Sequence, residues 1–188
     1  NKLRKKILKP GLLWITGLSG SGKSTICKMV YKKLKKKFNN IVLLDGDQLR
    51  KKLKINNIGT YSNKQRLKIG LMYVNECKRY IKNKKFVIIA VMALISKVQE
   101  EYKKIHNCND VFLDVPTSVL IKRDPKGLYK KFKNLEITNM VGLDIKYDKP
   151  KKPSLKIKWN KTKTKTKIVK QIIDLVYERK LIYSSYNE

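Results

Sequence analysis

A glycine-rich segment near the start of the chain has the residue types of a phosphate-binding loop. Residues 17–24 read Gly-Leu-Ser-Gly-Ser-Gly-Lys-Ser and match the pattern G-x-x-x-x-G-K-[ST]. Glycines let consecutive backbone N–H groups curl around a phosphate, Lys23 brings a positive charge to the β- and γ-phosphates, and the Ser24 hydroxyl can bind Mg²⁺. The alternative is a flexible glycine turn. The predicted ATP-binding residues are Gly17, Leu18, Ser19, Gly20, Ser21, Gly22, Lys23, Ser24 and Thr25.

Two carboxylates follow the second apolar run, in the segment Asp-Gly-Asp-Gln-Leu-Arg at residues 45–50. In an open α/β sheet the ligand crevice lies beyond the carboxyl ends of the strands, so both carboxylates are expected to face the γ-phosphate. Asp47 is the first candidate for the base that takes a proton from an attacking hydroxyl, and Asp45 is the second. Arg50, about one helical turn later, is placed to clamp an anionic acceptor. An Asp-Gly turn with a helix cap is the alternative.

A basic segment, Arg-Asp-Pro-Lys-Gly-Leu-Tyr-Lys-Lys at residues 123–131, follows a predicted strand and a short helix. Kinases with a glycine loop of this type carry a mobile lid at that position. Cations that arrive from a lid can neutralise charge in the transition state and exclude water. We therefore expect a lid over about residues 123–150, although the segment taken alone is more typical of a solvated run of charges.

The elements that must position these residues alternate between buried strands and helices. Strands are predicted at Leu12–Thr16, Ile41–Leu44, Phe86–Met92, Asp110–Val115 and 151–158, and helices at 25–37, 62–81 and 168–181. This order predicts one α/β domain over residues 1–188, with a mostly parallel sheet and helices on both faces. Phe86–Met92, a long β-branched run, is expected at the centre of the sheet. Residues 161–167 are expected to form a loop, and residues 1–10 a basic N-terminal extension.

The net charge of +32 over 188 residues invites a nucleic-acid interpretation. However, lysines far outnumber arginines and are spread over nearly every segment, whereas nucleic-acid readers cluster their basic residues and favour Arg at base edges. We favour a compositional bias that also attracts small anionic substrates, and we expect no specific nucleic-acid partner.

Other compositional features point to a cytoplasmic protein without a membrane partner. No apolar run approaches the roughly 20 residues of a membrane span. The apolar run behind the basic start, Leu12–Ile15, is too short for the core of a signal peptide. Cys27, Cys77 and Cys108 are scattered and form no metal-ligand pair, which is typical of reduced thiols.

Several segments together resemble the adenylylsulfate kinase family, in collinear order from Leu12 to Ile157. The matching segments are GLSGSGKST at Gly17–Thr25, LLDGDQLR at Leu43–Arg50, Tyr61-Ser62 with Arg66, FLDVP at Phe112–Pro116, and RDPKGLYKKFKNLEITNMVGLDIKYDKPKKP at Arg123–Pro153. The glycine loop is shared by many families, but the second and last segments in this order are far more specific.

The resemblance implies a P-loop NTPase fold, commonly a homodimer, that uses ATP and Mg²⁺. The implied reaction phosphorylates the 3′-hydroxyl of adenosine 5′-phosphosulfate, a step of sulfate assimilation, with Asp47 as the base. Lys126 and its lid neighbours would reach the phosphates, Arg123 would lie near the ATP base, and Tyr61 would stack on the acceptor base. The implied substrate-binding residues are Asp45, Arg50, Tyr61, Arg66, Lys126, Gly127 and Leu128.

The acceptor segments depart from the family pattern. Ile69-Gly70-Leu71-Met72 stands where the family has N-I-R-R, residues 93–97 replace I-S-P-[YF]-R, and Met140 stands where an aromatic residue stacks on the acceptor base. Ser96 cannot be aligned with the family's phosphorylatable serine. A related kinase group, which acts on cytidine diphosphoramidate, also lacks the proline and arginines and resembles this chain at Gly142–Ile145. The open alternatives are therefore another 5′-activated nucleotide and, more distantly, an inactive P-loop binding module.

Overall fold

The computed structural model describes residues 6–52, 55, 62–178 and 182–183. Five strands form a parallel sheet in the order β3-β4-β2-β5-β6. The strands are β2 (Gly11–Thr16), β3 (Ile41–Asp45), β4 (Phe86–Val91), β5 (Cys108–Asp114) and β6 (Leu155–Lys158). The predicted α/β architecture with a parallel sheet is confirmed, and β6 lies at the sheet edge, as expected.

The central strand is β2, so the placement of Phe86–Met92 at the centre was wrong. Every residue of both β2 and β4 is buried. Interior strands of a parallel sheet are covered on both faces and read as continuous apolar runs, so apolarity alone cannot rank one interior strand above another. β4 instead lies between β2 and β3.

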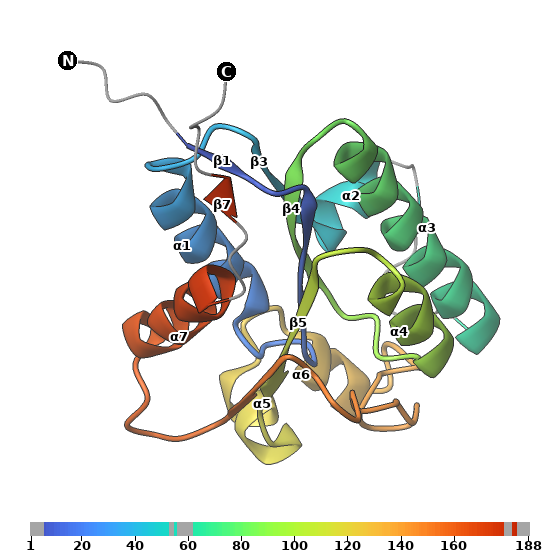
Figure 1. The fold of residues 1–188 in the computed structure, drawn as a ribbon. Helices are drawn as coiled ribbons and strands as arrows, with labels where there is room; N and C mark the ends of the chain where they lie inside the picture. The colour runs from blue at the N-terminus through green and yellow to red at the C-terminus, as the bar shows by residue number, and fades with distance from the viewer. Residues whose placement is uncertain (1–5, 53–54, 56–61, 179–181, 184–188) are drawn as a thin grey trace.

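Two layers of helices cover the sheet, one on each face (Figure 1). α1 (Lys23–Lys35) and α7 (Lys165–Glu178) pack on one face, and α3 (Asn63–Lys82) and α4 (Ser96–Lys103) on the other. α7 begins inside the 161–167 segment that was expected to be a loop. α4 was not predicted. α3 begins with a capping box, in which Ser62 and Gln65 exchange side-chain-to-backbone hydrogen bonds.

Gly70 allows a close approach between α3 and α4. A Cβ at Gly70 would lie 2.6 Å from Cγ2 of Val98, which is fully buried. The apolar pattern of both helices explains why they pack, but the small residue sets how near they come.

The segment expected to be a lid folds over the carboxyl end of the sheet. It contains the end of α5 (Thr117–Arg123) and α6 (Leu128–Lys133). Asp124 caps α6 by accepting hydrogen bonds from the backbone N–H groups of Tyr129 (3.2 Å) and Lys130 (2.9 Å). Seven buried side chains join this segment to the glycine loop and the sheet: Leu18, Leu94, Phe112, Leu120, Tyr129, Met140 and Val141.

A separate two-stranded antiparallel sheet joins residues near the two ends of the chain. β1 (Ile7–Leu8) pairs with β7 (Ile182–Tyr183). Leu8 is fully buried, and its backbone N–H and C=O are both bonded to the Asn40 side chain. Part of the segment expected to be an N-terminal extension therefore packs into the domain.

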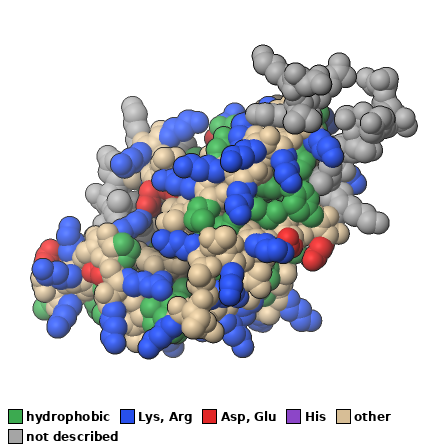
Figure 2. Space-filling view, turned by 90° about the vertical axis from the view of Figure 1, so that its left-hand side faces the viewer, with side chains coloured by type: hydrophobic (Ala, Val, Ile, Leu, Met, Phe, Trp, Pro, Cys, Tyr) green, Lys and Arg blue, Asp and Glu red, His purple; other side chains and the backbone are tan. Residues whose placement is uncertain are grey.

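Figure 2 shows Lys and Arg side chains scattered over the visible face, between apolar and polar side chains, so the positive charge of this face is dispersed. Within the described residues, no helix is both long and apolar enough to span a membrane. Cys27 and Cys77 are buried, Cys108 is partly exposed, and all three are free thiols.

Candidate active site

A cavity of about 550 Å³ lies beyond the carboxyl ends of β2, β3 and β4. The glycine loop, α2 (Gly46–Lys52), α3 and the lid segment contribute its walls. The predicted site residues that line it are Ser19, Gly20, Gly22, Lys23, Ser24, Thr25, Asp45, Asp47, Arg50, Arg66, Lys126 and Leu128. The glycine loop, the Asp-Gly-Asp segment and the lid, all distant in sequence, thus meet around one space.

Other predicted residues do not line this cavity. Gly17, Leu18 and Ser21 are buried residues of the glycine loop, Arg123 is exposed at the end of α5, and Gly127 lies outside the lining. Tyr61 lies outside the described residues. Gly17 has a structural role, because a Cβ there would lie 2.7 Å from Ser21 Oγ and 2.9 Å from the Leu113 carbonyl oxygen.

The glycine loop closes on itself through Lys23. Its Nζ donates to the Leu18 carbonyl at 2.9 Å, and Gly20 and Gly22 have φ values of 77° and 90°, a region open to glycine. Desolvation by burial and then the charge of Lys126 lower the pKa of Lys23 to about 8, against the opposing pull of Asp47 and Asp45. The phosphates of a bound nucleotide would stabilise the charged form of this partly buried ammonium.

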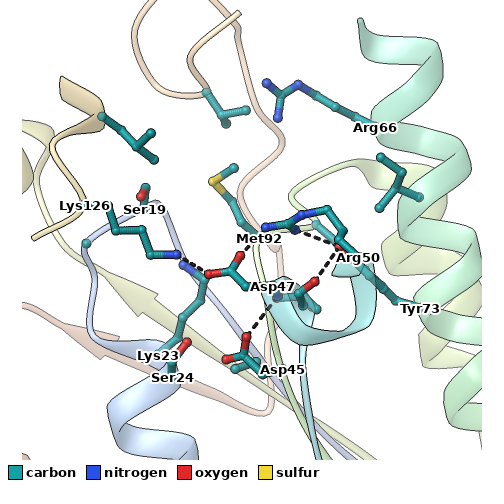
Figure 3. A pocket seen from close by; sticks show the side chains of 18 of the residues that line it. Ser19, Lys23, Ser24, Asp45, Asp47, Arg50, Arg66, Tyr73, Met92 and Lys126 are labelled. Carbon is teal, nitrogen blue, oxygen red and sulfur yellow. Dashed lines mark hydrogen bonds and ion pairs between the residues drawn. The ribbon is translucent and has the colours of Figure 1, made fainter. Parts of the chain in front are cut away.

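Asp47 lies at the meeting point of α2 and the lid (Figure 3). Its carboxylate pairs with Arg50 on one oxygen and with Lys126 on the other, and its backbone N–H donates to Asp45 at 2.9 Å. Burial, the largest single influence, raises the pKa of Asp47, but the hydrogen bond and charge of Lys126, together with Arg50, outweigh it and hold the pKa below its ordinary value. Asp47 is therefore ionised and able to accept a proton at neutral pH.

Tyr73 is a site residue that sequence reasoning missed. It lies on α3, is only 3% exposed, and lines the cavity. Its hydroxyl accepts a hydrogen bond from Arg50 at 2.8 Å and donates to the Gly46 carbonyl at 3.3 Å. The spacing from Arg66 to Ile69, Gly70 and Tyr73 is the i, i+3, i+4, i+7 pattern of one helix face, which was the available signal.

The lid is tied to the glycine loop as well as to Asp47. The Tyr129 hydroxyl donates to the Ser19 carbonyl at 3.1 Å. Burial, followed by the charges of Asp124 and Tyr147, raises the pKa of Tyr129 to about 12, so this hydroxyl keeps its proton at neutral pH. Pro125 also packs near Gly20. These contacts hold the predicted lid segment against the glycine loop.

The other end of the cavity is largely apolar. Arg66 donates to the Asn139 carbonyl at this end. Ile69, Met92, Ala93, Ile137 and Met140 surround it. Of the four residues that replace N-I-R-R, Ile69 and Gly70 line the cavity, whereas Leu71 and Met72 do not. Ser96 starts α4, and its backbone N–H donates to Asp148 at 2.7 Å.

The oxygen atoms present fit a magnesium ion that is held mainly by nucleotide. Among the described residues, no group of three or more acidic, His or Cys side chains forms a metal site. The Ser24 hydroxyl and the Asp45 and Asp47 carboxylates line the cavity. Mg²⁺ prefers such hard oxygen ligands and usually takes only one or two from protein beside phosphates and water. Ser24 is the residue that would hold it.

The chain is similar in sequence to a known protein family and to several of its members. Residues 9–158 match the family model described as Adenylylsulphate kinase. A cytidine diphosphoramidate kinase of Campylobacter jejuni is 37% identical over 142 residues, covering 75% of this chain and 82% of that protein. An adenylyl-sulfate kinase of Clostridium acetobutylicum is 36% identical over 186 residues, covering 95% and 90%.

Among solved structures, the Mycobacterium tuberculosis APS kinase in complex with AMPPNP and APS superposes with a TM-score of 0.81 at 28% identity, covering 90% of this chain and 99% of that one. The fold and the P-loop kinase architecture therefore agree with a solved relative over nearly the whole chain. With the family model covering most of the sequence, the chain belongs to the adenylylsulfate kinase family and is a kinase, a phosphotransferase that uses ATP.

Proposed function

We propose that this kinase transfers the γ-phosphoryl group of ATP to the 3′-hydroxyl of adenosine 5′-phosphosulfate and so yields 3′-phosphoadenosine 5′-phosphosulfate. The observation that carries the proposal is the meeting of Lys23, Asp47 and Lys126 in one cavity that continues into a second, apolar end. The first end fits a polyphosphate and the second an acceptor nucleoside.

In the proposed reaction the acceptor oxygen attacks the γ-phosphorus and its proton passes to the Asp47 carboxylate. The bond from the γ-phosphorus to the β,γ-bridging oxygen breaks, and ADP leaves. Lys23 and Lys126 neutralise charge on the phosphoryl oxygens, and Ser24 would hold Mg²⁺, which supplies further charge neutralisation when bound. Phosphoryl transfer needs mainly positioning, so a carboxylate with a low pKa is an adequate base.

Lys126 has two anionic partners in this scheme. In the structure Lys126 pairs with Asp47. The phosphates of ATP carry more negative charge than one carboxylate, so we expect Lys126 to move to them when ATP binds. This exchange frees one Asp47 oxygen for the acceptor hydroxyl and links lid position to base availability.

Cytidine diphosphoramidate is the second candidate acceptor. The Campylobacter jejuni relative named for that substrate is 37% identical to this chain. The apolar replacements at Ile69 and Met140 also remove polar and aromatic contacts that the family resemblance implies for adenylyl sulfate. The relatives named for adenylyl sulfate match more of the chain, which favours the first candidate.

The deciding experiment compares kcat/KM for adenosine 5′-phosphosulfate and for cytidine diphosphoramidate, with ATP saturating. We expect turnover of the adenylyl compound with a raised KM. A preference of about a hundredfold for the cytidine compound, equal to about 2.7 kcal/mol, would reverse the order of the two candidates. No ATP-dependent phosphorylation of either would return the inactive binding module to consideration.

A homodimer, a cytoplasmic location, a magnesium requirement and the absence of a specific nucleic-acid partner are further parts of the proposal. The dispersed lysines support only weak, salt-sensitive binding to DNA. Light scattering tests the dimer, and activity with and without EDTA tests the metal. Sequence-selective DNA binding at physiological salt would contradict the last part.

A further inference from the structure

Tyr73 connects two neighbouring helices of the site, α2 and α3. Its side chain projects from α3 into the space between Arg50 and Gly46, which are both residues of α2 (Figure 3). α2 and α3 are separated by residues 53–62 in the sequence. The Tyr73 hydroxyl thus links Gly46 and Arg50 of α2 to α3 through hydrogen bonds.

The directions of these hydrogen bonds follow from the groups involved. A carbonyl can only accept, so the single hydroxyl proton of Tyr73 points to Gly46. A guanidinium can only donate, so Arg50 uses a lone pair of the same oxygen. The hydroxyl is therefore satisfied in both capacities, and neither bond can be made by a phenylalanine at this position.

Arg50 is held at two points as a result. One terminal nitrogen donates to Tyr73 and the other to Asp47. A planar guanidinium that is fixed at both terminal nitrogens has one orientation, and it presents its remaining surface to the cavity that it lines. Without the tyrosine hydroxyl, Arg50 would keep Asp47 but lose one of the contacts that fix the orientation of its guanidinium.

We propose that Tyr73 is a positioning residue for Arg50 and, through it, a determinant of how well the acceptor nucleotide is bound. The inference rests on the proposed function, the phosphorylation of an anionic nucleotide acceptor. Ile69-Gly70-Leu71-Met72, directly before Tyr73, supplies no cation to an anionic acceptor. A rigidly held Arg50 provides the charge-assisted contact that these four residues cannot.

The test is Tyr73→Phe, measured on whichever of the two candidate nucleotides the wild type turns over. We expect kcat/KM for the acceptor to fall about tenfold, which is about 1.4 kcal/mol, while KM for ATP stays unchanged. In an Arg50→Ala background the same substitution should have no further effect, because its route to the acceptor is gone.

The matched control is Tyr102→Phe. Tyr102 is also a fully buried tyrosine, its hydroxyl bonds Asp110 at 3.3 Å, and it does not line the cavity. The Tyr102→Phe variant should have a lower melting temperature and unchanged kinetics. Three outcomes would each overturn the proposal. Tyr73→Phe could change the KM of both substrates equally, it could leave the kinetics at the wild-type level, or its tenfold loss could persist in the Arg50→Ala background.

One readout does not depend on turnover and so separates this inference from the proposed function. Nuclear magnetic resonance can detect the guanidinium N–H signals of Arg50. Slow rotation and separate signals in the wild type and in Tyr102→Phe, with averaged signals in Tyr73→Phe, support the positioning role even if neither nucleotide is phosphorylated. Unchanged Arg50 signals in Tyr73→Phe would contradict it.

Discussion

The two ends of the cavity are built in different ways. At the donor end, residues 17–22 form a continuous loop that leads into α1, and backbone N–H groups, the partly buried Lys23 and Ser24 provide the chemistry. At the acceptor end, side chains from α2, α3, the end of β4 and the lid segment converge from distant parts of the sequence. Few backbone conformations can hold phosphates, so the sequence of such a loop is restricted. A pocket built from side chains can instead change its specificity one residue at a time. The reaction can therefore persist while the acceptor changes.

Asp47 lies between the two ends, and its removal is the strongest way to test the division. Asp47→Asn should lower kcat by roughly 10²–10⁴-fold, the usual contribution of a general base, with little change in ATP affinity. Single-turnover kinetics and ATP titration check both quantities. A comparable loss of ATP binding would assign Asp47 to the magnesium ion instead, and an unchanged kcat would exclude both roles.

The donor end should respond to Lys23→Ala with a loss of roughly 10²–10³-fold in kcat, as for other preorganised charges in active sites. Because burial lowers the pKa of Lys23, the unfolded chain binds more protons between about pH 8 and the ordinary lysine pKa, so the charged lysine costs folding stability at neutral pH. Thermal melting of the variant should therefore show no loss of stability. A Lys23→Ala variant that melts normally and keeps the wild-type kcat would contradict the assignment of Lys23 to the phosphates.

A single added polar group at the acceptor end should increase the affinity for the acceptor. Ile69→Asn should lower KM for adenosine 5′-phosphosulfate by about fivefold, the size of one net hydrogen bond. Leu71→Asn is the control, because it makes the same kind of change on the same helix outside the cavity lining. Steady-state kinetics for both substrates check this. A similar KM in both variants would show that Ile69 does not contact the acceptor.

The smallest expected effect concerns pH at the donor end. With a pKa of about 8, about half of the nucleotide-free protein carries a neutral Lys23 at pH 8. Since the charged form binds phosphate, ATP affinity should fall about twofold between pH 7 and pH 8, and binding above pH 8 should take up a proton. Calorimetry in two buffers measures the uptake. Lys23→Ala should show weak binding with no such dependence, and a proton-neutral wild type would contradict the assignment.

The same contrast explains how much of the molecule could be predicted from the sequence. Residues 17–24 and the Asp-Gly-Asp segment are local patterns with a defined geometry, so Lys23, Ser24 and Asp47 were placed together correctly. The parallel sheet followed from the alternation of apolar runs with helical spacing. The strand order did not, because β2 and β4 are equally buried and equally apolar.

Residues that act through another element escaped prediction. Tyr73 reads as one more apolar position on a helix face, and its hydroxyl gains a role only when α2 lies beside α3. Long-range packing, which no local pattern encodes, gives Tyr73 this role. Arg123 was assigned to the ATP base from the resemblance; it is exposed and outside the cavity lining, and its role stays a prediction.

The pairing of β1 with β7 has a consequence for how the domain is made. It joins Ile7 to Tyr183 and Leu8 to Ile182, partners separated by almost the full sequence. On the ribosome, this sheet can close only after the five strands of the large sheet have emerged. Closing so long a loop is entropically costly, so we expect this pairing late on the folding pathway and early on the unfolding pathway. A circular permutant that joins the two strands by a short linker would convert this most distant contact into a hairpin.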